Sequence, residues 1–357
     1  KPGAGATVLD CDEGELQKLT LREEARKVFY TRRENTWSEE NVWWVEAYRL
    51  PFTSPETEEP PTATETAADT GELDVDVASM GPAEDAPPAG GRAQAKPDMA
   101  PGEAEWTVSE SFPGNENLRE TLAELCPWKG LRSLGNPGKE KLEEFGLTDT
   151  TDSLVLTLRG NKPRTFLIGK TSFGPRDRYV QDEGTGEVFL VTGQSIKNLL
   201  YPKSRYMERE LHDFPEDEVM RLRLVAGERK VELVHRFSPD GTDEGWAEPG
   251  PDAEPKELYA NWIRKVFTLR PVDYRVPEKG SEEPDKYGCG APPGATTAAS
   301  ITFSGETRTL GFLTLYERTD EKGKNEYFAC TEKTMSVVLL SKTQAENLLK
   351  DMADILP

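Results

Sequence analysis

Residues 166–200 read FLIGKTSFGPRDRYVQDEGTGEVFLVTGQSIKNLL, and this stretch contains the pattern that decides the fold. Two apolar runs, FLIGK and RYVQD, flank a loop with a Gly-Pro pair, and a third run, VFLV, comes after a turn. Short apolar runs between turn residues predict antiparallel β-strands. The stretch ends in an amphipathic segment that finishes Asn-Leu-Leu, which predicts a short helix.

The Gly-Lys-Thr tripeptide at 169–171 matches the end of a phosphate-binding loop. Such a loop needs a glycine five residues before the Gly-Lys pair, but that position holds Arg164. A helix should also follow the threonine, and the Gly-Pro pair at 174–175 would break it. We therefore expect two strands joined by a loop, and no nucleotide site.

The same order of elements recurs later in the chain. VVLLSKTQAENLL at 337–349 matches VFLVTGQSIKNLL at 188–200, and ELQKLTL at 15–21 matches EVMRLRL at 218–224. The last two alternate apolar and polar residues, as half-buried strands do. We expect an α+β fold of two tandem similar repeats, each an antiparallel sheet with a packed helix and a short C-terminal helix. The alternative is a pair of unrelated α+β domains.

The repeat predicts the domain boundaries. We expect the first repeat at 1–200, a connector at 201–214 and the second repeat at 215–357. The segment 51–104 is rich in Pro, Ala, Glu and Asp and cannot bury enough apolar surface to offset its ordering entropy. It is expected to be a disordered acidic insertion in the first repeat, and 277–298 a flexible loop in the second.

Composition and motifs exclude several classes of function. The 357 residues carry a formal net charge of -21, which argues against nucleic-acid or anionic-membrane partners because both need basic surfaces. No apolar run is long enough to span a bilayer. The motifs GxSxG, HExxH and GxGxxG are absent, as are CxxC spacings. We expect a chain that is not an enzyme, with no cofactor, no metal site and no catalytic residue.

One histidine and one tryptophan of the second repeat have counterpart positions in the first repeat. His235 ends a strand whose counterpart position is Arg32, and Trp246 corresponds to Trp106. A lone histidine at a strand end usually lies at the surface or is satisfied by a neighbour, so we assign it no catalytic role. The other histidine, His212, falls in the connector.

Two groups of residues stand out as candidates. Trp43, Trp44 and Tyr48 lie close together in ENVWWVEAYRLPF, and aromatic residues are enriched in interface hot spots, so they form a candidate interaction surface. The alternative is that one tryptophan packs beneath the sheet and the other covers an edge. Cys289 and Cys330 can pair in an oxidising compartment.

Cys126 follows leucines at helical spacing, which predicts a core position for it.

The opening VLDCDEGELQKLTLR, the block at 166–200 and its echo at 312–349 resemble the bacterial family called domain of unknown function 4340. The resemblance covers nearly the whole chain apart from 51–104 and 277–298.

The resemblance implies an extracytoplasmic α+β region behind one N-terminal membrane helix, often beside ABC-type permeases of the gliding-motility or auxiliary-export kind. That helix would precede Lys1. We therefore expect a periplasmic interaction or scaffold module, anchored to the inner membrane and bound to a membrane protein complex, with β-strand addition as one possible mode. The alternative is a module that binds glycan or lipid in a groove between the repeats.

Overall fold

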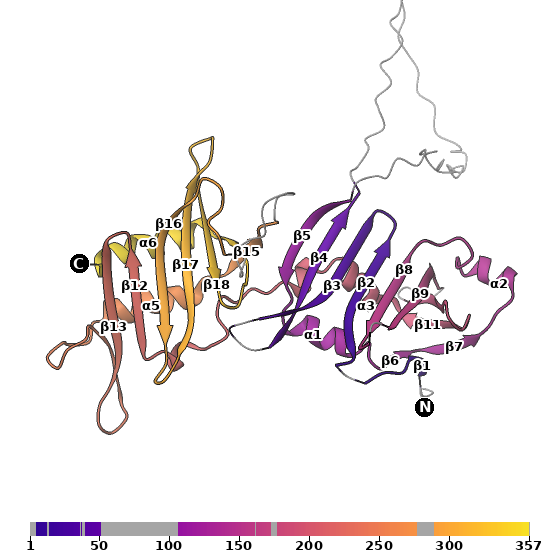
Figure 1. Ribbon diagram of the computed structural model, residues 1–357, viewed down its shortest axis with the longest axis horizontal. Helices are drawn as coiled ribbons and strands as arrows, with labels where there is room; N and C mark the ends of the chain where they lie inside the picture. The colour runs from indigo at the N-terminus through magenta and orange to yellow at the C-terminus, as the bar shows by residue number, and fades with distance from the viewer. Residues whose placement is uncertain are drawn as a thin grey trace, which may run out of the picture. The chain divides into compact units, whose positions relative to one another are not determined.

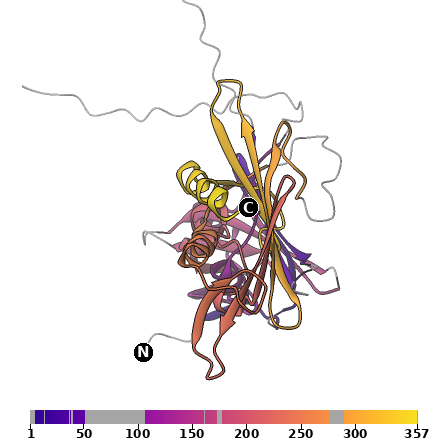
Figure 2. The same cartoon turned by 90° about the vertical axis from the view of Figure 1, so that its left-hand side faces the viewer.

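Alternating buried and exposed positions build two large antiparallel sheets, each with helices on one side (Figures 1 and 2). This computed structural model describes residues 5–12, 14–35, 37, 40–50, 106–160, 162–172, 177–276 and 289–356. Both sheets belong to one unit, Lys1–Arg49 with Thr107–Pro357. The predicted acidic insertion at 51–104 lies outside the described residues. The α+β class is confirmed.

The first sheet has nine strands in the order β5-β4-β3-β2-β8-β9-β10-β11-β7. A separate two-stranded sheet joins β1 (Ala6–Leu9) to β6 (Trp128–Gly130). The strands of the large sheet are β2 (Leu16–Glu23), β3 (Arg26–Glu34), β4 (Asn41–Arg49), β5 (Thr107–Pro113), β7 (Arg132–Gly135), β8 (Ser153–Leu158), β9 (Lys162–Thr171), β10 (Asp177–Asp182) and β11 (Val188–Thr192).

The inner face of this sheet is apolar and contacts helix α3 (Gly193–Leu200). The core therefore lies on the side where the strand alternation places the buried side chains. Arg26 Nε donates to the carbonyl of Leu200 at 2.6 Å, and the buried Tyr30 hydroxyl donates to the carbonyl of Leu199. Burial raises the pKa of Tyr30 well above its usual value, so the phenol stays neutral and can act as a donor. These bonds satisfy carbonyls at the end of α3 that the helix itself leaves free.

Three further helices complete this part of the chain: α1 (Glu116–Ala123), α2 (Lys139–Glu144) and α4 (Lys203–Tyr206). Asn115 caps α1, because its side chain accepts a hydrogen bond from Leu118 N at 3.3 Å. The predicted connector at 201–214 contains α4, and it buries Met207 and Leu211 in the core. This segment is therefore packed against its surroundings.

The Gly-Lys-Thr tripeptide lies inside β9, and Val180 of β10 pairs with Ile168. The prediction of two strands at this point is confirmed. Gly169 is required here by close packing, since a Cβ at this position would lie 2.4 Å from the carbonyl oxygen of Phe145. The glycine that suggests a phosphate loop in the sequence therefore has a packing role.

The second sheet has eight strands in the order β14-β13-β12-β16-β17-β18-β19-β15. Its elements are a 3-10 turn at Glu216–Glu218, then β12 (Arg221–Ala226), β13 (Arg229–Phe237), β14 (Asp243–Ala247), α5 (Glu257–Thr268), β15 (Pro271–Tyr274), β16 (Thr296–Ser304), β17 (Thr309–Thr319), β18 (Asn325–Thr331), β19 (Val338–Leu340) and α6 (Lys342–Ile355). Helices α5 and α6 are joined by Trp262 Nε1, which donates to the carbonyl of Leu348 at 3.2 Å.

The predicted flexible loop at 277–298 is only partly described. Residues 277–288 lie outside the described part, and Cys289 is the first residue after them. The prediction is wrong at its C-terminal end, because Thr296 already begins β16 and pairs with Glu317 of β17. The strand starts earlier than its apolar residues because backbone pairing with β17 extends through the polar threonines.

Candidate functional site

The outer face of the first sheet is the side of β2, β3 and β4 opposite the helices. Strand alternation turns Leu19 and Leu21 inward, so Lys18, Thr20 and Arg22 point outward. By the same rule, the outward positions of β3 and β4 include cationic and aromatic side chains. We call this surface the Phe29 face; it consists of Lys18, Arg22, Lys27, Phe29, Arg33, Trp44, Glu46 and Tyr48.

Phe29 lies at the centre of this face and contacts two cations. Lys18 Nζ is 5.3 Å and Lys27 Nζ is 4.8 Å from the centroid of its ring. The ring of Tyr48 meets that of Phe29 edge to face at 5.3 Å. Cation–π contacts and edge-to-face rings hold these long side chains in defined positions. These contacts connect the side chains of the Phe29 face with one another.

Arg33 organises the neighbouring part of the Phe29 face. Its guanidinium carbon is 4.4 Å from the ring of Trp44, and its Nη2 is 3.0 Å from Glu46 Oε1. Burial raises the pKa of Tyr48, the Glu46 carboxylate adds to the effect and Arg33 opposes it. The phenol thus stays neutral beside several positive charges.

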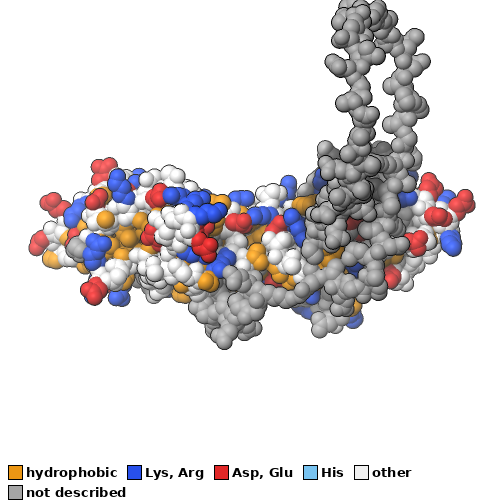
Figure 3. Space-filling model, turned by 90° about the horizontal axis from the view of Figure 1, so that it is seen from above, with side chains coloured by type: hydrophobic (Ala, Val, Ile, Leu, Met, Phe, Trp, Pro, Cys, Tyr) orange, Lys and Arg blue, Asp and Glu red, His pale blue; other side chains and the backbone are white. Residues whose placement is uncertain are grey.

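The charge of the Phe29 face is opposite in sign to that of the chain. Four cationic residues, Lys18, Arg22, Lys27 and Arg33, stand against one carboxylate, Glu46, while the whole sequence has a net charge of -21. Seen from above in Figure 3, acidic and basic side chains are interspersed over the coloured part of the surface. A chain with a negative net charge can therefore still carry a local surface with a positive charge.

The structure separates the three predicted aromatic residues. Trp43 and Trp44 are consecutive in β4 and lie on opposite faces, with exposures of only 7% and 4%. Trp44 and the half-buried Tyr48 belong to the Phe29 face, and Trp44 Nε1 donates to Ser111 Oγ at 3.1 Å. Trp43 packs on the inner side, so the expectation of one surface formed by all three residues needs correction.

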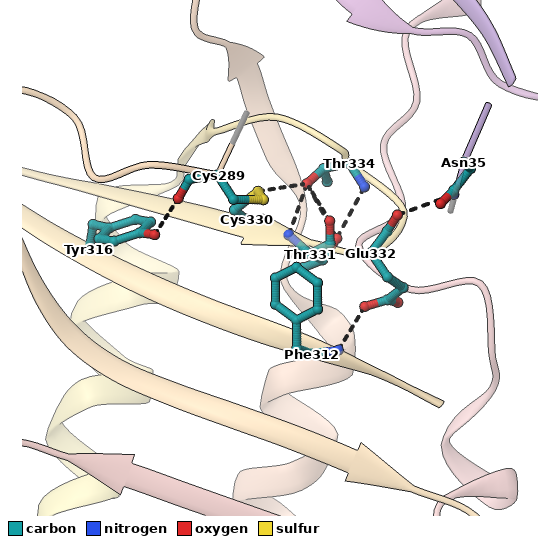
Figure 4. The surroundings of a disulfide bond; sticks show 8 residues. All are labelled: Asn35, Cys289, Phe312, Tyr316, Cys330, Thr331, Glu332 and Thr334. Atoms are coloured by element: carbon teal, nitrogen blue, oxygen red, sulfur yellow. Dashed lines mark hydrogen bonds between the residues drawn. A yellow bond between two sulfur atoms is a disulfide. The ribbon is translucent and has the colours of Figure 1, made fainter. Parts of the chain in front are cut away.

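The described chain contains two disulfides. Cys289 and Cys330 pair as the sequence allows (Figure 4). The same region buries Tyr316, Phe328 and Val337 on the outer side of the second sheet. Cys126 is buried as predicted, but it pairs with Cys11, which the sequence analysis did not foresee. The two residues are 115 positions apart, and only the folded chain brings them together.

A buried polar cluster, also drawn in part in Figure 4, was missed by sequence reasoning. Glu332 Oε1 is 2.9 Å from His212 Nδ1, and Glu332 Oε2 accepts a hydrogen bond from Phe312 N at 2.9 Å. Asn35 Nδ2 donates to the carbonyl of Glu332 at 3.2 Å. Nothing in the local sequence marks these residues, because they come from three distant segments.

The His212–Glu332 pair is enclosed by aromatic rings. Phe214, Phe267 and Phe303 have centroids 4.8–5.3 Å from the imidazole. His212 Nε2 is buried and has no hydrogen-bond partner in the described chain. The surrounding rings favour a packing role for the imidazole over general base catalysis, since a base must reach the proton it removes.

His235 lies at the end of β13, as predicted. Its Nε2 is 2.9 Å from Asp243 Oδ1, and its ring stacks on Trp246 at 4.8 Å. The histidine is thus satisfied only in part: Nε2 has a partner, whereas Nδ1 is buried without one in the described chain. Within the described ranges, no group of three or more His, Cys, Asp and Glu side chains is placed to hold a metal ion.

The family model described as Domain of unknown function (DUF4340) matches residues 114–292, half of the chain. The chain belongs to this family. The match runs from α1 to the loop after Cys289 and is narrower than the resemblance suggested by the sequence; it does not include β2, β3 and β4. No curated protein and no solved structure matches the chain. Among the residues described, no helix is long and apolar enough to cross a membrane.

Proposed function

We propose that this protein is a non-enzymatic interaction module that binds an acidic surface of a partner protein through the Phe29 face. The observation that supports this most strongly is the cluster of ordered cations and aromatic rings on the helix-free side of β2 and β3. Charge complementarity steers the encounter of two proteins and suppresses wrong partners. Aromatic rings add apolar contact area at a small entropy cost, because few of their torsions become fixed.

Family membership and the two disulfides support a location in the cell envelope. Disulfides persist in oxidising compartments, and both Cys11–Cys126 and Cys289–Cys330 are compatible with the periplasm. We infer a protein tethered to the inner membrane, which works as a scaffold beside an ABC-type permease or a gliding-type machine. The acidic partner surface would then belong to that membrane protein complex.

We further infer that the chain is made of two similar repeats, one for each large sheet. The strand order β3-β2-β8-β9-β10-β11-β7 in one sheet parallels β13-β12-β16-β17-β18-β19-β15 in the other. Arg32 pairs with Trp43 across β3 and β4, and His235 pairs with Trp246 across β13 and β14. By this comparison, the residue of the first repeat that corresponds to Trp246 is Trp43. The sequence had suggested Trp106 for that position.

The test of the interaction proposal is a charge reversal on the Phe29 face. Lys18→Glu combined with Lys27→Glu should weaken capture of the native partner by at least about tenfold when the membrane-anchored protein is crosslinked in native envelopes. The matched control is Arg223→Glu with Lys230→Glu, two exposed cations on the outer face of the second sheet. Equal partner recovery from both double variants would refute the assignment of the Phe29 face.

A second candidate function, glycan binding, has one observation in its favour. A cavity of about 400 Å³ is lined by four asparagine side chains, Asn35, Asn41, Asn115 and Asn117, together with charged residues. Amide groups both donate and accept hydrogen bonds, which suits a ligand rich in hydroxyl groups better than a lipid. A rise in melting temperature with a soluble glycan, abolished by Asn117→Ala, would favour this function.

A further inference from the structure

A second cavity, of about 360 Å³, opens on the inner side of the first sheet, beside α1 and the start of β2. It does not involve the Phe29 face, and the inference drawn from it goes beyond the proposed function. We call it the Arg32 pocket; it is lined by Gly14, Leu16, Arg32, Trp43, Arg119, Leu122, Ala123 and Cys126.

Arg32 is the residue that gives this pocket its chemistry. Its guanidinium carbon is 5.1 Å from the ring of Trp43, and its Nε is buried without a hydrogen-bond partner in the described parts of the chain. Two other arginines of β3 differ from Arg32 because each pairs with a carboxylate, although Nη1 of Arg26 is also buried without a partner in the described chain. Arg26 bonds to Leu200 and Glu110, and Arg33 pairs with Glu46.

The walls around Arg32 combine apolar and polar surface in about equal parts. Leu16 and Leu122 are buried core residues, and Trp43 presents the ring that carries the guanidinium. The other cation, Arg119, is already engaged, because its Nη2 is 2.6 Å from Glu116 Oε2. The pocket therefore combines a guanidinium that is not neutralised by a described residue with apolar side chains in its wall.

A guanidinium fork matches the geometry of a planar carboxylate and binds it through two parallel hydrogen bonds. A phosphate dianion would need a second free cation for neutralisation, and Arg119 is held by Glu116. The apolar side chains in the wall favour a ligand with several carbons attached to its acidic group. The chemistry of the pocket thus selects a carboxylate with an apolar group over an inorganic anion.

We propose that the Arg32 pocket binds the carboxylate of a small amphipathic ligand, with Arg32 on the acidic group and Leu16 and Leu122 against its apolar part. Two sources offer this chemistry: a free short-chain carboxylic acid, and the C-terminal carboxylate of a peptide that ends in an apolar residue. Both place one negative charge next to an apolar group of a few carbons.

The experiment is calorimetric titration of the full chain with acetate, butanoate, hexanoate, a Gly-Leu dipeptide acid and the corresponding Gly-Leu amide. Affinity should rise by about fourfold for each methylene that enters the apolar part of the pocket. The amide should bind at least about tenfold more weakly than the acid, because it lacks the charge that the guanidinium recognises. Binding of the dipeptide acid alone identifies a peptide end as the source, and binding of hexanoate alone identifies a free acid.

Arg32→Met should weaken binding by at least about tenfold, since it keeps an apolar side chain on Trp43 but removes the fork. Arg33→Met is the matched control: it removes the adjacent guanidinium, which stacks on Trp44 on the opposite face, and should leave carboxylate binding unchanged. Arg32→Lys serves as a second variant that retains the charge without the fork, and it should also bind more weakly.

Three results would overturn the proposal: no binding of any carboxylate at millimolar concentration, equal affinities of acetate and hexanoate, or unchanged affinity in both Arg32 variants. The outcome is independent of the proposed interaction function, which depends on Lys18 and Lys27. Loss of partner capture in the Lys18→Glu, Lys27→Glu variant with intact hexanoate binding would separate the two sites.

Discussion

Gly311 lies against the buried polar cluster of Glu332, and its missing side chain is what allows the cluster to form. A Cβ at this position would be 2.4 Å from the Glu332 carboxyl carbon and 2.6 Å from Phe214 Cε1. The carboxylate cannot move aside easily, because Phe312 N and His212 hold both of its oxygens. Gly311→Ala should therefore lower the free energy of unfolding by about 1–3 kcal/mol, as overpacking in cores does.

Urea unfolding measures this effect, and Gly290→Ala is the control because a Cβ there would meet no atom within 4 Å. An unchanged unfolding midpoint in Gly311→Ala would mean that the Glu332 cluster is looser than the distances indicate.

Lys333 is the cation of an ion cluster with Glu208, Glu210 and Asp213. The hydrogen bond from Lys333 lowers the pKa of Glu210 below the usual 4.5, so its stabilising contribution is lost as pH falls through that lowered pKa. Burial lowers the pKa of Lys333, but the three carboxylates outweigh it and raise the pKa above 10.5. The Lys333 contribution is therefore complete below about pH 10 and lost as pH rises through the raised pKa.

Lys333→Met should lower the free energy of unfolding by about 1–2 kcal/mol at neutral pH, because three carboxylates lose their counter-charge. The effect is small because the Glu210 side chain is 64% exposed and its charge is screened by solvent. The difference from the wild type should shrink below pH 4, where the carboxylates take up protons. Unfolding curves across the pH range provide the measurement, and a difference that stays constant with pH would contradict this account.

At the scale of elements, the disulfide Cys289–Cys330 ties the segment before β16 to β18. It lies next to a small apolar cluster of Tyr316, Phe328 and Val337 on the side of the second sheet away from the helices. Replacing both cysteines by alanine should lower the free energy of unfolding by about 2–4 kcal/mol, because the unfolded chain regains the entropy that the bond removes.

Thermal unfolding with and without a reducing agent distinguishes this bond from Cys11–Cys126. The Cys289→Ala, Cys330→Ala protein should still lose stability on reduction through the remaining bond, whereas a protein without any of the four cysteines should be insensitive. A double variant as stable as the wild type would show that the cluster does not depend on the disulfide.

The elements that the sequence predicts correctly are those whose pattern is local. The strands and helix of 166–200 follow from residue alternation and helical spacing, which need no knowledge of distant contacts. Short strands such as β1 and β6 were missed because four and three residues carry no period, and their pairing of Ala6 with Gly130 is purely tertiary.

The candidate site was predictable only in part. Tyr48 and Trp44 belong to the Phe29 face, but Trp43 was misplaced although strand periodicity alone excludes two consecutive residues from one face. Lys18, Lys27 and Phe29 could have been found by applying the same alternation to β2 and β3. The pairing of Glu332 with His212 and of Cys11 with Cys126 could not, because each pair is more than one hundred positions apart in the sequence.

For the molecule as a whole, the net charge and the charge of the Phe29 face have opposite signs. A chain with a net charge of -21 repels anionic polymers at long range, while a small cationic face can still bind an acidic protein patch at contact distance. Screening limits the long-range repulsion to about 8–10 Å at physiological ionic strength. Binding through the Phe29 face should accordingly weaken as salt concentration rises.

The most direct measurement is site-specific photo-crosslinking of the full-length, membrane-anchored protein in living cells. A photoreactive amino acid at Thr20, in the middle of the Phe29 face, is compared with one at Thr302, an outward position of the second sheet. The account predicts an adduct with an acidic envelope protein at Thr20, lost with Lys27→Glu, and none at Thr302. An adduct at Thr302 alone, or a Thr20 adduct that persists with Lys18→Glu and Lys27→Glu, would contradict it.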